Sequence, residues 1–489
     1  MQPLLDREYS LPLTPSVERR ILLRTDPVDA NSSALIMKLL NRRHALKMFT
    51  ASTAGIASGM PLWGSARYFQ QAPSRQPRIT EVEVQEIISP LHDYNARALF
   101  RSQSDIPVRT IYIVRTDTGL EGYGEKWALK TPGEDLSQYL GTTPFDWFAT
   151  THNMPMSMAL YDLMGKILGV PLWKLLGPQV RKWVPVAAWT VSQPPEAMAE
   201  EVRQVSARGY RWLKYHVDVF QNAIDQTAAM QDAAPPGFKI HYDFNADSEL
   251  AAVYPVLREL EKFPVAGEIE DPINIEDHEA WKALRTKCGL PLIFHHALDS
   301  TEFYVRHGLC DGFVASRFPV GTNMRLAALA ESTRMPFILQ LPGGNLSMAF
   351  LAHQAAVYKM ATLPGIPLAN LWKDDVTVES IPVVAGSVQV PEGPGLGLSL
   401  DQQKCEQYAA ASRPDPGRFL FRVRYGNGPT LYLRPDQKRH ALHTGSSTLP
   451  GPVPGYGNPI RTDHWDDDGS PEFRKVWRET GDGPVWQGL

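Results

Sequence analysis

Apolar and polar positions alternate in two rhythms along residues 184–385 of this 489-residue chain. Segments with apolar residues at helical spacing, such as 248–263, are each followed by a short apolar stretch typical of a buried strand, such as 265–272. Each of these strands ends in a polar residue, and consecutive end residues lie 21 to 29 positions apart. The six end residues are Lys214, Asp243, Glu270, His296, Arg317 and Gln340.

A strand, a helix and two loops need about that length, so the repeat predicts an α/β fold with a parallel sheet closed into a barrel. The alternative is an open, doubly wound sheet. That fold usually carries a glycine-rich phosphate turn after its first strand, and this sequence has none.

The regions on either side follow other patterns. Residues 78–125 are rich in β-branched residues around a Thr-Gly turn and predict strands, and residues 155–177 repeat apolar residues at helical spacing. Residues 413–489 predict a hairpin around Asn427 and Gly428, followed by a segment rich in Gly, Pro and Asp.

The N-terminus carries a targeting pattern. Arg42 and Arg43 precede a weakly apolar run of small residues that ends at Ala66, and this resembles a twin-arginine export signal. We therefore expect a periplasmic or extracellular protein, with residues 1–66 outside the fold and translation starting at Met37. The alternative is a chance arginine pair on a surface helix. The run is too polar for a stable membrane span.

Composition narrows the class of partner. An apolar fraction of 43% with 21% charged residues is typical of a soluble globular protein. The net charge of −4 favours neither nucleic acid nor an anionic membrane surface as a partner.

The polar strand ends predict a functional site. In a barrel, alternate strand residues point inward and the carboxyl ends of the strands form the floor of the site. Carboxylates gathered there repel one another unless a cation neutralises them, which predicts a divalent metal. We predict Asp243, Glu270 and His296 as its ligands, with Asn245 or water as the alternative to His296. His296 is chosen because it is in phase with Phe294, and His295 is then expected to face the helices.

Lys214 and His216 share a face one strand before this cluster and are the candidate acid/base residues. A base within reach of the carbon next to a metal-held carboxylate can remove its proton. We expect the positively charged surroundings to lower the pKa of both side chains. The alternative for Lys214 is a structural ion pair with Asp243.

Several of these segments together resemble the enolase superfamily, in its mandelate racemase/muconate lactonizing branch. Residues 115–125 are similar to the end of that family's capping domain, residues 158–177 to its linking helix, and residues 388–401 to its closing segment. "LKYH" stands where the branch has Lys-x-Lys, and "YDFN" and "EIEDP" stand at its first two metal-ligand strands.

The resemblance implies an enolase-like fold made of an α+β capping domain and a modified TIM barrel, (β/α)7β. It places the capping part at 67–183, the barrel at 184–385, a return segment to the cap at 386–412 and a C-terminal extension rich in Gly and Pro at 413–489.

The chemistry implied is Mg²⁺-assisted removal of a proton α to a carboxylate through an enediolate. Asp243 and Glu270 would bind the metal, and Lys214 and His216 would provide the acid/base side. The family has a carboxylate where this chain has His296, and a nitrogen ligand suits Mn²⁺, Fe²⁺ or Zn²⁺ better.

The face opposite Lys214 lacks a second base, because Gln340 stands where the racemases have histidine. A one-base dehydration of an acid sugar or hydroxy acid is therefore the expected reaction, catalysed by a lyase that we expect to be a homo-oligomer. Asn245, Arg317 and Gln340 are the predicted contacts of a small carboxylate substrate. The alternatives are a racemase or epimerase of the same superfamily and an exported binding protein that has lost catalysis.

Overall fold

The computed structural model describes residues 76–102, 105–246, 248–296, 298–435 and 459–488. The chain divides into two units after Ser74, and the described residues lie in the second, Arg75–Leu489. The predicted export signal at 37–66 lies outside the described residues. Within the described ranges, no helix is both long and apolar enough to cross a membrane.

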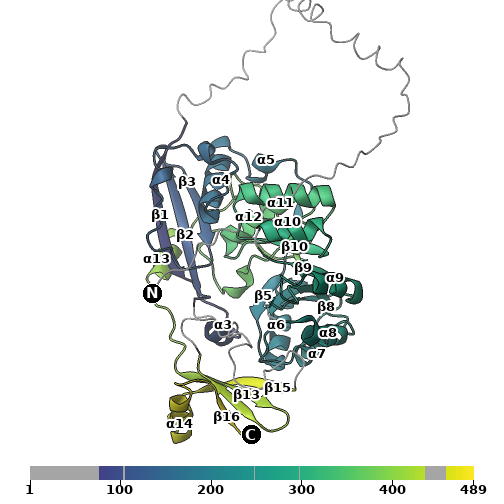
Figure 1. Cartoon of the computed structure of the whole chain (residues 1–489). Coiled ribbons are helices and arrows are strands. Elements are labelled where there is room, and N and C mark those ends of the chain that lie inside the picture. Colours follow the sequence, from purple (N-terminus) through teal and green to yellow (C-terminus); the bar gives the residue numbers. More distant parts are fainter. Residues whose placement is uncertain (1–75, 103–104, 247, 297, 436–458, 489) are drawn as a thin grey trace, which may run out of the picture. The chain divides into compact units, whose positions relative to one another are not determined.

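The second unit begins with a three-stranded antiparallel sheet in the order β1-β2-β3, followed by α4 (Figure 1). Two glycines of β3 let the backbone of α4 approach closely, since a Cβ atom on Gly124 would lie 2.0 Å from the carbonyl oxygen of Pro155. The elements of this region are β1 (Ile79–Ile88), α3 (Ala96–Ser102), β2 (Val108–Thr116), β3 (Glu121–Lys126), η1 (Ser137–Tyr139), η2 (Pro144–Trp147), α4 (Met154–Leu168), α5 (Trp173–Leu176) and β4 (Trp183–Pro185).

The helix α4 is buried over its first three turns and has defined ends. The side chain of Asn153 caps it by accepting a hydrogen bond from the backbone of Met156, and Gly169 ends it in the left-handed conformation, with φ of 64°. Its buried Asp162 accepts a 2.7 Å hydrogen bond from the backbone N–H of Leu396. This bond joins the helix to the segment that returns after the barrel.

Seven parallel strands follow, paired in the order β11-β10-β9-β8-β7-β6-β5. The two edges of this sheet are joined by Gly365 and Ile366, which form parallel bridges to Val186 and Gln340. The barrel therefore closes through a very short eighth segment. The strands are β5 (Ala188–Val191), β6 (Trp212–His216), β7 (Lys239–Asp243), β8 (Ala266–Glu270), β9 (Leu292–Phe294), β10 (Gly312–Ser316) and β11 (Phe337–Gln340).

A helix follows each strand, as the alternating pattern predicts. The helices are α6 (Pro195–Ala207), α7 (Ala223–Ala233), α8 (Leu250–Leu260), α9 (His278–Lys287), α10 (Leu298–Arg306), α11 (Val320–Thr333) and α12 (Asn345–Ala355), with a short η3 (Ala369–Leu371) after them. One apolar cluster contains Trp189, Ile293, Val314 and Ile338, which come from strands that are not all neighbours. These side chains therefore fill the barrel interior, beneath the carboxyl ends of the strands.

The chain then returns to the first sheet. Strand β12 (Ser387–Gln389) pairs antiparallel with β4, and α13 (Gln402–Ala409) packs against β1. The capping, barrel and return arrangement agrees with an enolase-like α/β fold.

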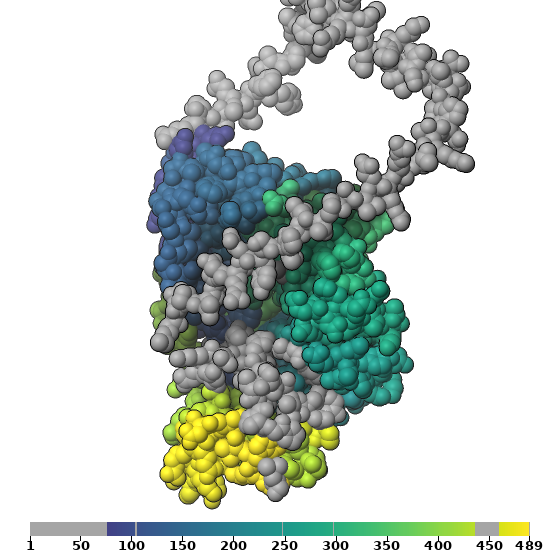
Figure 2. All heavy atoms as spheres, viewed as in Figure 1, coloured from purple at the N-terminus to yellow at the C-terminus, as the bar shows by residue number. Residues whose placement is uncertain are grey.

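The last residues form a separate four-stranded antiparallel sheet in the order β15-β13-β14-β16. The predicted hairpin at Asn427 and Gly428 is confirmed, because Arg424 pairs with Thr430 across it. Figure 2 shows this sheet and its helix in yellow-green and yellow. Its elements are β13 (Phe419–Tyr425), β14 (Thr430–Leu433), β15 (Ile460–Asp466), α14 (Pro471–Glu479) and β16 (Val485–Gln487).

Candidate active site

The carboxyl ends of β6, β7 and β8 bring three predicted residues together. In the parallel register, His216 pairs with Asp243, and Asp243 pairs with Glu270. Because neighbouring positions in a parallel sheet share a face, these side chains converge on one rim of the barrel. Successive strand residues point to opposite faces of the sheet, so counting residues along each strand in the sequence is sufficient to assign these side chains to the same face.

Lys214 lies completely buried among the predicted acidic residues. Its ammonium group donates to both carboxylate oxygens of Glu270, at 2.7 and 2.8 Å, and lies 3.0 Å from Asp243. It also donates a 2.9 Å hydrogen bond to the side-chain oxygen of Gln340. The structural ion pair with Asp243 is thus present, and it extends to Glu270.

These contacts act against the expected lowering of the pKa of Lys214. Burial alone lowers the pKa, but the charges of Asp243 and Glu270 and their hydrogen bonds outweigh it and raise the pKa above its ordinary value. With these partners Lys214 favours the ammonium form, in which it positions carboxylates and supplies positive charge.

His216 is the other predicted acid/base residue. Its Nε2 atom lies 3.3 Å from a carboxylate oxygen of Asp243, and its ring stands edge-on against Trp189 at 5.1 Å. The side chain is 22% exposed, which gives a small molecule access to it. The neighbouring carboxylate and indole fix the orientation of the imidazole.

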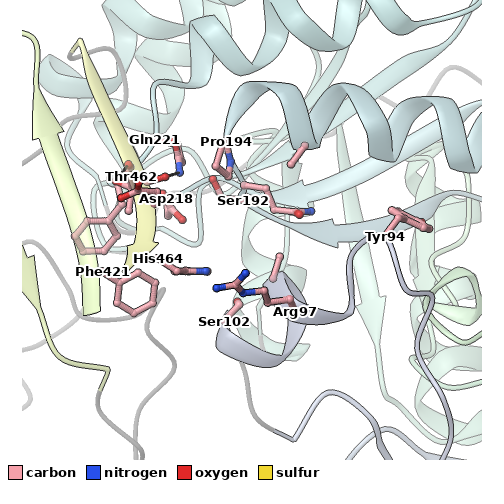
Figure 3. A pocket seen from close by; sticks show the side chains of 15 residues that line it. Tyr94, Arg97, Ser102, Ser192, Pro194, Asp218, Gln221, Phe421, Thr462 and His464 are labelled. Atoms are coloured by element: carbon pink, nitrogen blue, oxygen red, sulfur yellow. Dashed lines mark hydrogen bonds between the residues drawn. The ribbon is translucent and has the colours of Figure 1, made fainter. Parts of the chain in front are cut away.

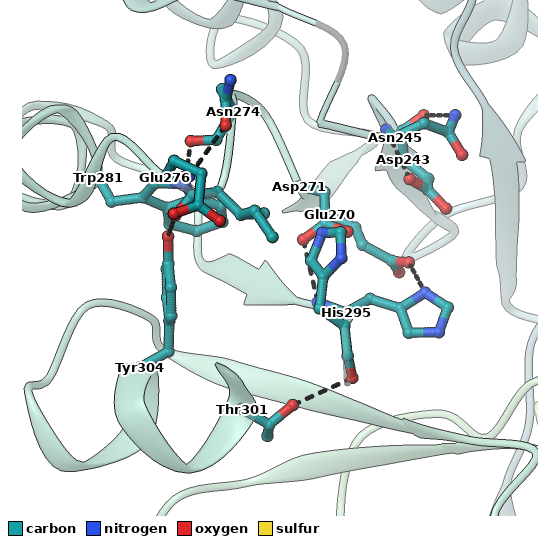
Figure 4. A network of polar contacts seen from close by, with 12 residues as sticks. Asp243, Asn245, Glu270, Asp271, Asn274, Glu276, Trp281, His295, Thr301 and Tyr304 are labelled. Atoms are coloured by element: carbon teal, nitrogen blue, oxygen red, sulfur yellow. Dashed lines mark hydrogen bonds and ion pairs between the residues drawn. The ribbon is translucent and has the colours of Figure 1, made fainter. Parts of the chain in front are cut away.

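The two histidines after β9 are placed opposite to the prediction. His295 Nδ1 lies 2.8 Å from Glu270 Oε1, and Figure 4 shows its ring directed at that carboxylate. His296 instead lies 3.1 Å from Asp271. The expectation that His296 faces the site and His295 the helices is therefore wrong.

The reason is the phase of β9. Phe294 stacks on Tyr304 of α10 at 3.7 Å between ring centres, so it faces the helices. Ile293 belongs to the interior cluster. The prediction places Phe294 in the barrel interior because it is large and apolar. In this fold the layer between the sheet and the helices is also an apolar core, and Phe294 lies there. His295 shares the inward phase with Ile293.

Asp243, Glu270 and His295 form the candidate metal centre. One ligand atom from each lies within 4.8 Å of the others. Glu270 keeps its charge at this depth: burial raises its pKa, but Lys214, His295 and His241 outweigh burial and hold the pKa well below the usual range. Two carboxylates and one imidazole are a suitable donor set for a divalent ion.

A buried histidine, His241, was missed by sequence reasoning. Its Nδ1 lies 2.8 Å from Glu268 and its Nε2 lies 2.6 Å from Glu270. Burial lowers its pKa, but the two carboxylates outweigh burial and raise the pKa to about 9. The available signal was its spacing, because His241 stands two residues before Asp243 and shares its face.

The three predicted substrate contacts occupy different surroundings. Gln340 reaches the site through its bond to Lys214. Asn245, at φ 55°, donates its backbone N–H to Asp243 at 2.9 Å and so shapes the turn that holds this carboxylate. Arg317, also left-handed at φ 56°, places its guanidinium 5.6 Å from the ring centre of Trp127, which follows β3.

The ends of β10 and β11 offer no second base. Strand β10 ends at Ser316, followed by Arg317, and β11 ends at Gln340, followed by Leu341. None of these side chains is an effective proton acceptor at neutral pH. The arrangement can therefore hold a cation, orient a carboxylate and move a proton on the His216 side.

Comparisons with known proteins agree with this geometry. Residues 197–404 match the family model described as enolase C-terminal domain-like. The chain is 26% identical over 278 residues to a D-gluconate dehydratase of Thermoproteus tenax, an alignment that covers 52% of this chain and 55% of that protein. It is also 26% identical over 286 residues to a D-galactonate dehydratase of Xanthomonas axonopodis pv. citri, covering 53% of this chain and 74% of that one.

A similar solved structure is that of a dipeptide epimerase from Cytophaga hutchinsonii in complex with Mg and the dipeptide D-Ala-L-Val. It superposes with a TM-score of 0.55 at 20% identity, covering 68% of this chain and 98% of the epimerase. At this identity the likeness supports the fold alone.

Proposed function

Because the chain belongs to the enolase superfamily, in its mandelate racemase/muconate lactonizing branch, we propose that it removes a proton α to a carboxylate and dehydrates an acid sugar or hydroxy acid. The observation that carries the proposal is a partly exposed imidazole, His216, next to the cluster of Asp243, Glu270 and His295. The similarity to two sugar-acid dehydratases supports this substrate class. The gluconate dehydratase is matched over about half its length, so the activity is proposed from the site.

A divalent ion bound by Asp243, Glu270 and His295 would supply positive charge for a substrate carboxylate and for the negative charge that develops beside it. By family resemblance the ion is Mg²⁺. The imidazole nitrogen, which belongs to His295 and not to His296, also suits Mn²⁺, Fe²⁺ or Zn²⁺.

His216 performs the proton transfers in this proposal. One nitrogen of its imidazole accepts the α-proton, and the electron pair of that C–H bond forms a carbon–carbon double bond as the β-hydroxyl leaves. The same imidazole then donates the proton to the departing hydroxide, which leaves as water. One base on one face is sufficient for dehydration, whereas racemisation needs a proton donor on the opposite face as well.

Lys214 positions the groups around the reaction. Its ammonium holds Glu270, Asp243 and the amide oxygen of Gln340 in fixed places. Since its pKa is raised, it stays charged while His216 exchanges protons. It therefore limits the build-up of negative charge on this side of the barrel without competing for the substrate proton.

The test uses the full chain with Mg²⁺ or Mn²⁺ and a set of acid sugars that includes D-gluconate and D-galactonate. We expect loss of water from at least one of them and incorporation of deuterium from D₂O at the β-carbon, as the enol formed by dehydration becomes the keto acid. The variant His216→Asn should bind the metal normally and lose about 10²- to 10⁴-fold in rate, the usual contribution of a general base.

The other outcomes point to the alternatives. Inversion with exchange in place of water loss identifies a racemase or epimerase and contradicts the proposal. If the protein binds metal but no substrate shows proton exchange, the dehydratase proposal is also contradicted, and the remaining alternative is a binding protein. The ion pairs of Lys214 with Asp243 and Glu270 are consistent with that alternative.

A further inference from the structure

A buried histidine–carboxylate pair lies next to the candidate metal centre. His241 on β7 pairs with Glu268 on β8 in the parallel register, two residues before Asp243 pairs with Glu270. Both side chains are almost completely buried. Neither belongs to the candidate metal centre, and the proposed proton transfers do not use them. The pair therefore needs an explanation of its own.

The imidazole of His241 bridges two carboxylates. Its Nδ1 lies 2.8 Å from Oε1 of Glu268, and its Nε2 lies 2.6 Å from Oε2 of Glu270. An ionised carboxylate only accepts hydrogen bonds, so both ring nitrogens donate and the ring carries one positive charge. Bonds between charged groups are stronger than bonds between neutral ones. Glu268 therefore balances the charge of His241 and orients its ring, and the opposite nitrogen holds Glu270.

The bond from His241 distinguishes the two oxygens of Glu270. Oε2 is the oxygen that His241 holds, whereas Oε1 lies 2.8 Å from Nδ1 of His295, a second candidate metal ligand (Figure 4). Lys214 contacts both oxygens, at 2.7 and 2.8 Å, and so does not distinguish them. Of the two cationic side chains on this carboxylate, His241 is the one that selects a single oxygen.

We propose that His241, oriented by Glu268, is a positioning residue that restricts Glu270 to one oxygen ligand and thereby favours a small divalent ion over Ca²⁺. The inference rests on the metal centre of the proposed function. Ca²⁺ takes more oxygen ligands than Mg²⁺ and accepts both oxygens of one carboxylate. A carboxylate with one oxygen already bonded to a histidine is therefore a poorer ligand for Ca²⁺ than for a smaller ion. Hydrogen-bond partners of metal ligands commonly contribute to affinity in this way.

Two substitutions of His241 separate the two bonds of its ring. The amide nitrogen of glutamine stands at about the position of the histidine Nε2, and that of asparagine at about the position of Nδ1. His241→Gln therefore keeps the bond to Glu270, whereas His241→Asn keeps only the contact with Glu268. Both variants put a neutral amide in the same buried place, so the loss of the ring's charge is common to them.

The measurement is calorimetric titration of the full chain with Mn²⁺ and with Ca²⁺, after removal of bound metal by a chelator. His241→Gln should keep the wild-type ratio of the two affinities. In His241→Asn the affinity for Mn²⁺ should fall about 10- to 100-fold, the usual effect of removing a partner of a metal ligand. The Ca²⁺ affinity should fall much less, because the second oxygen of Glu270 becomes available to it.

A milder variant and a control accompany them. Glu268→Gln is nearly isosteric and should lower the ratio of Mn²⁺ to Ca²⁺ affinity roughly two- to tenfold, since a neutral partner orients the imidazole less firmly. It carries the test if His241→Asn does not fold. His353→Gln is the matched control, because His353 is another buried histidine and its Nε2 lies 3.2 Å from the backbone oxygen of Leu396 in the return segment. It should leave both affinities unchanged.

Three results would overturn the inference. Equal weakening of Mn²⁺ and Ca²⁺ in His241→Asn would give the pair a structural role only. A wild-type ratio in His241→Asn or Glu268→Gln would mean that other residues select the ion, and loss of the preference in His241→Gln would contradict the role of the Nε2 bond. Failure of the proposed function looks different: a wild type that binds no ion removes the metal centre itself, and a wild type that keeps its ion preference without proton exchange contradicts only the dehydratase activity.

Discussion

Replacement of Lys214 by methionine gives a direct test of the buried charge network. The Lys214 side chain is fully buried, and its ammonium is the group that joins Asp243, Glu270 and Gln340. In Lys214→Met the two carboxylates keep their burial and lose this cation. Breaking a buried ion pair by removing one partner costs about 3–5 kcal/mol, and methionine preserves most of the packing volume. A loss of that size is a large part of the roughly 5–15 kcal/mol that stabilises a folded domain.

The assay is urea unfolding of both proteins at neutral pH in the presence of a chelator. Lys239→Met is the matched control, since the Lys239 amine on β7 bonds to the backbone oxygens of Pro264 and Ala266 at 2.8 and 3.2 Å. We expect the control to change the free energy of unfolding by less than about 1 kcal/mol. Added divalent metal should stabilise Lys214→Met more than the wild type, because the ion replaces the missing positive charge. A Lys214→Met protein as stable as its control would refute the account of the network.

Three further changes test other parts of the fold. Burial lowers the pKa of His353 from 6.5 to about 4, so the unfolded chain takes up a proton at a higher pH than the folded protein does. The free energy of unfolding should therefore fall by about 1.4 kcal/mol for each pH unit between 6.5 and about 4 as the pH drops. In His353→Gln the slope of unfolding free energy against pH should be smaller by one proton, and an unchanged slope would contradict the assignment. Gly124→Ala puts a Cβ atom 2.0 Å from the carbonyl oxygen of Pro155. We expect the free energy of unfolding to fall by about 1–3 kcal/mol in thermal unfolding. An unchanged melting temperature would contradict this expectation. The side chain of Asn222 caps α7 by accepting a 2.9 Å hydrogen bond from the backbone N–H of Ile224. Asn222→Ala should lower the free energy of unfolding in urea by about 1 kcal/mol, whereas Asn222→Asp should lower it little. Equal losses in the two variants would contradict the capping role.

The barrel could be predicted from sequence because its signal repeats. Each βα unit encodes the same two rhythms, and strands β6 to β11 all fall where the apolar stretches predicted them. Strand β5 was not identified individually, because its last residue, Val191, is apolar and does not belong to the series of polar strand ends. The closing bridge at Gly365 and Ile366 is shorter still and has no periodic pattern.

The site was predictable wherever strand phase was unambiguous. Asp243 and Glu270 are the last residues of strands whose inward and outward positions alternate clearly, and the parallel register pairs them with each other. The choice between His295 and His296 failed because β9 has only three regular residues, all of them apolar, so the pattern could not tell inward from outward. Tertiary packing against α10 decides the phase, and sequence spacing carries no information about that contact.

Other parts of the site depend on contacts between distant segments. The raised pKa of Lys214 follows from its position between Asp243 and Glu270, which lie on two other strands. The cavity lined by residues of α3 and β15 (Figure 3) brings together segments separated by more than half of the chain. A single sequence does not reveal such neighbours.

The most direct test of the central claim is the metal content of the full chain after dialysis against Mn²⁺, compared among single variants. We predict about one ion per chain for the wild type and for His296→Ala, and a loss of that ion in both His295→Ala and Glu270→Ala, because His295 and Glu270 belong to the candidate metal centre and His296 does not. His295 and His296 are adjacent in sequence, so each variant controls for the other. Loss of the ion in His296→Ala with retention in His295→Ala, or no bound ion in the wild type, would contradict the account.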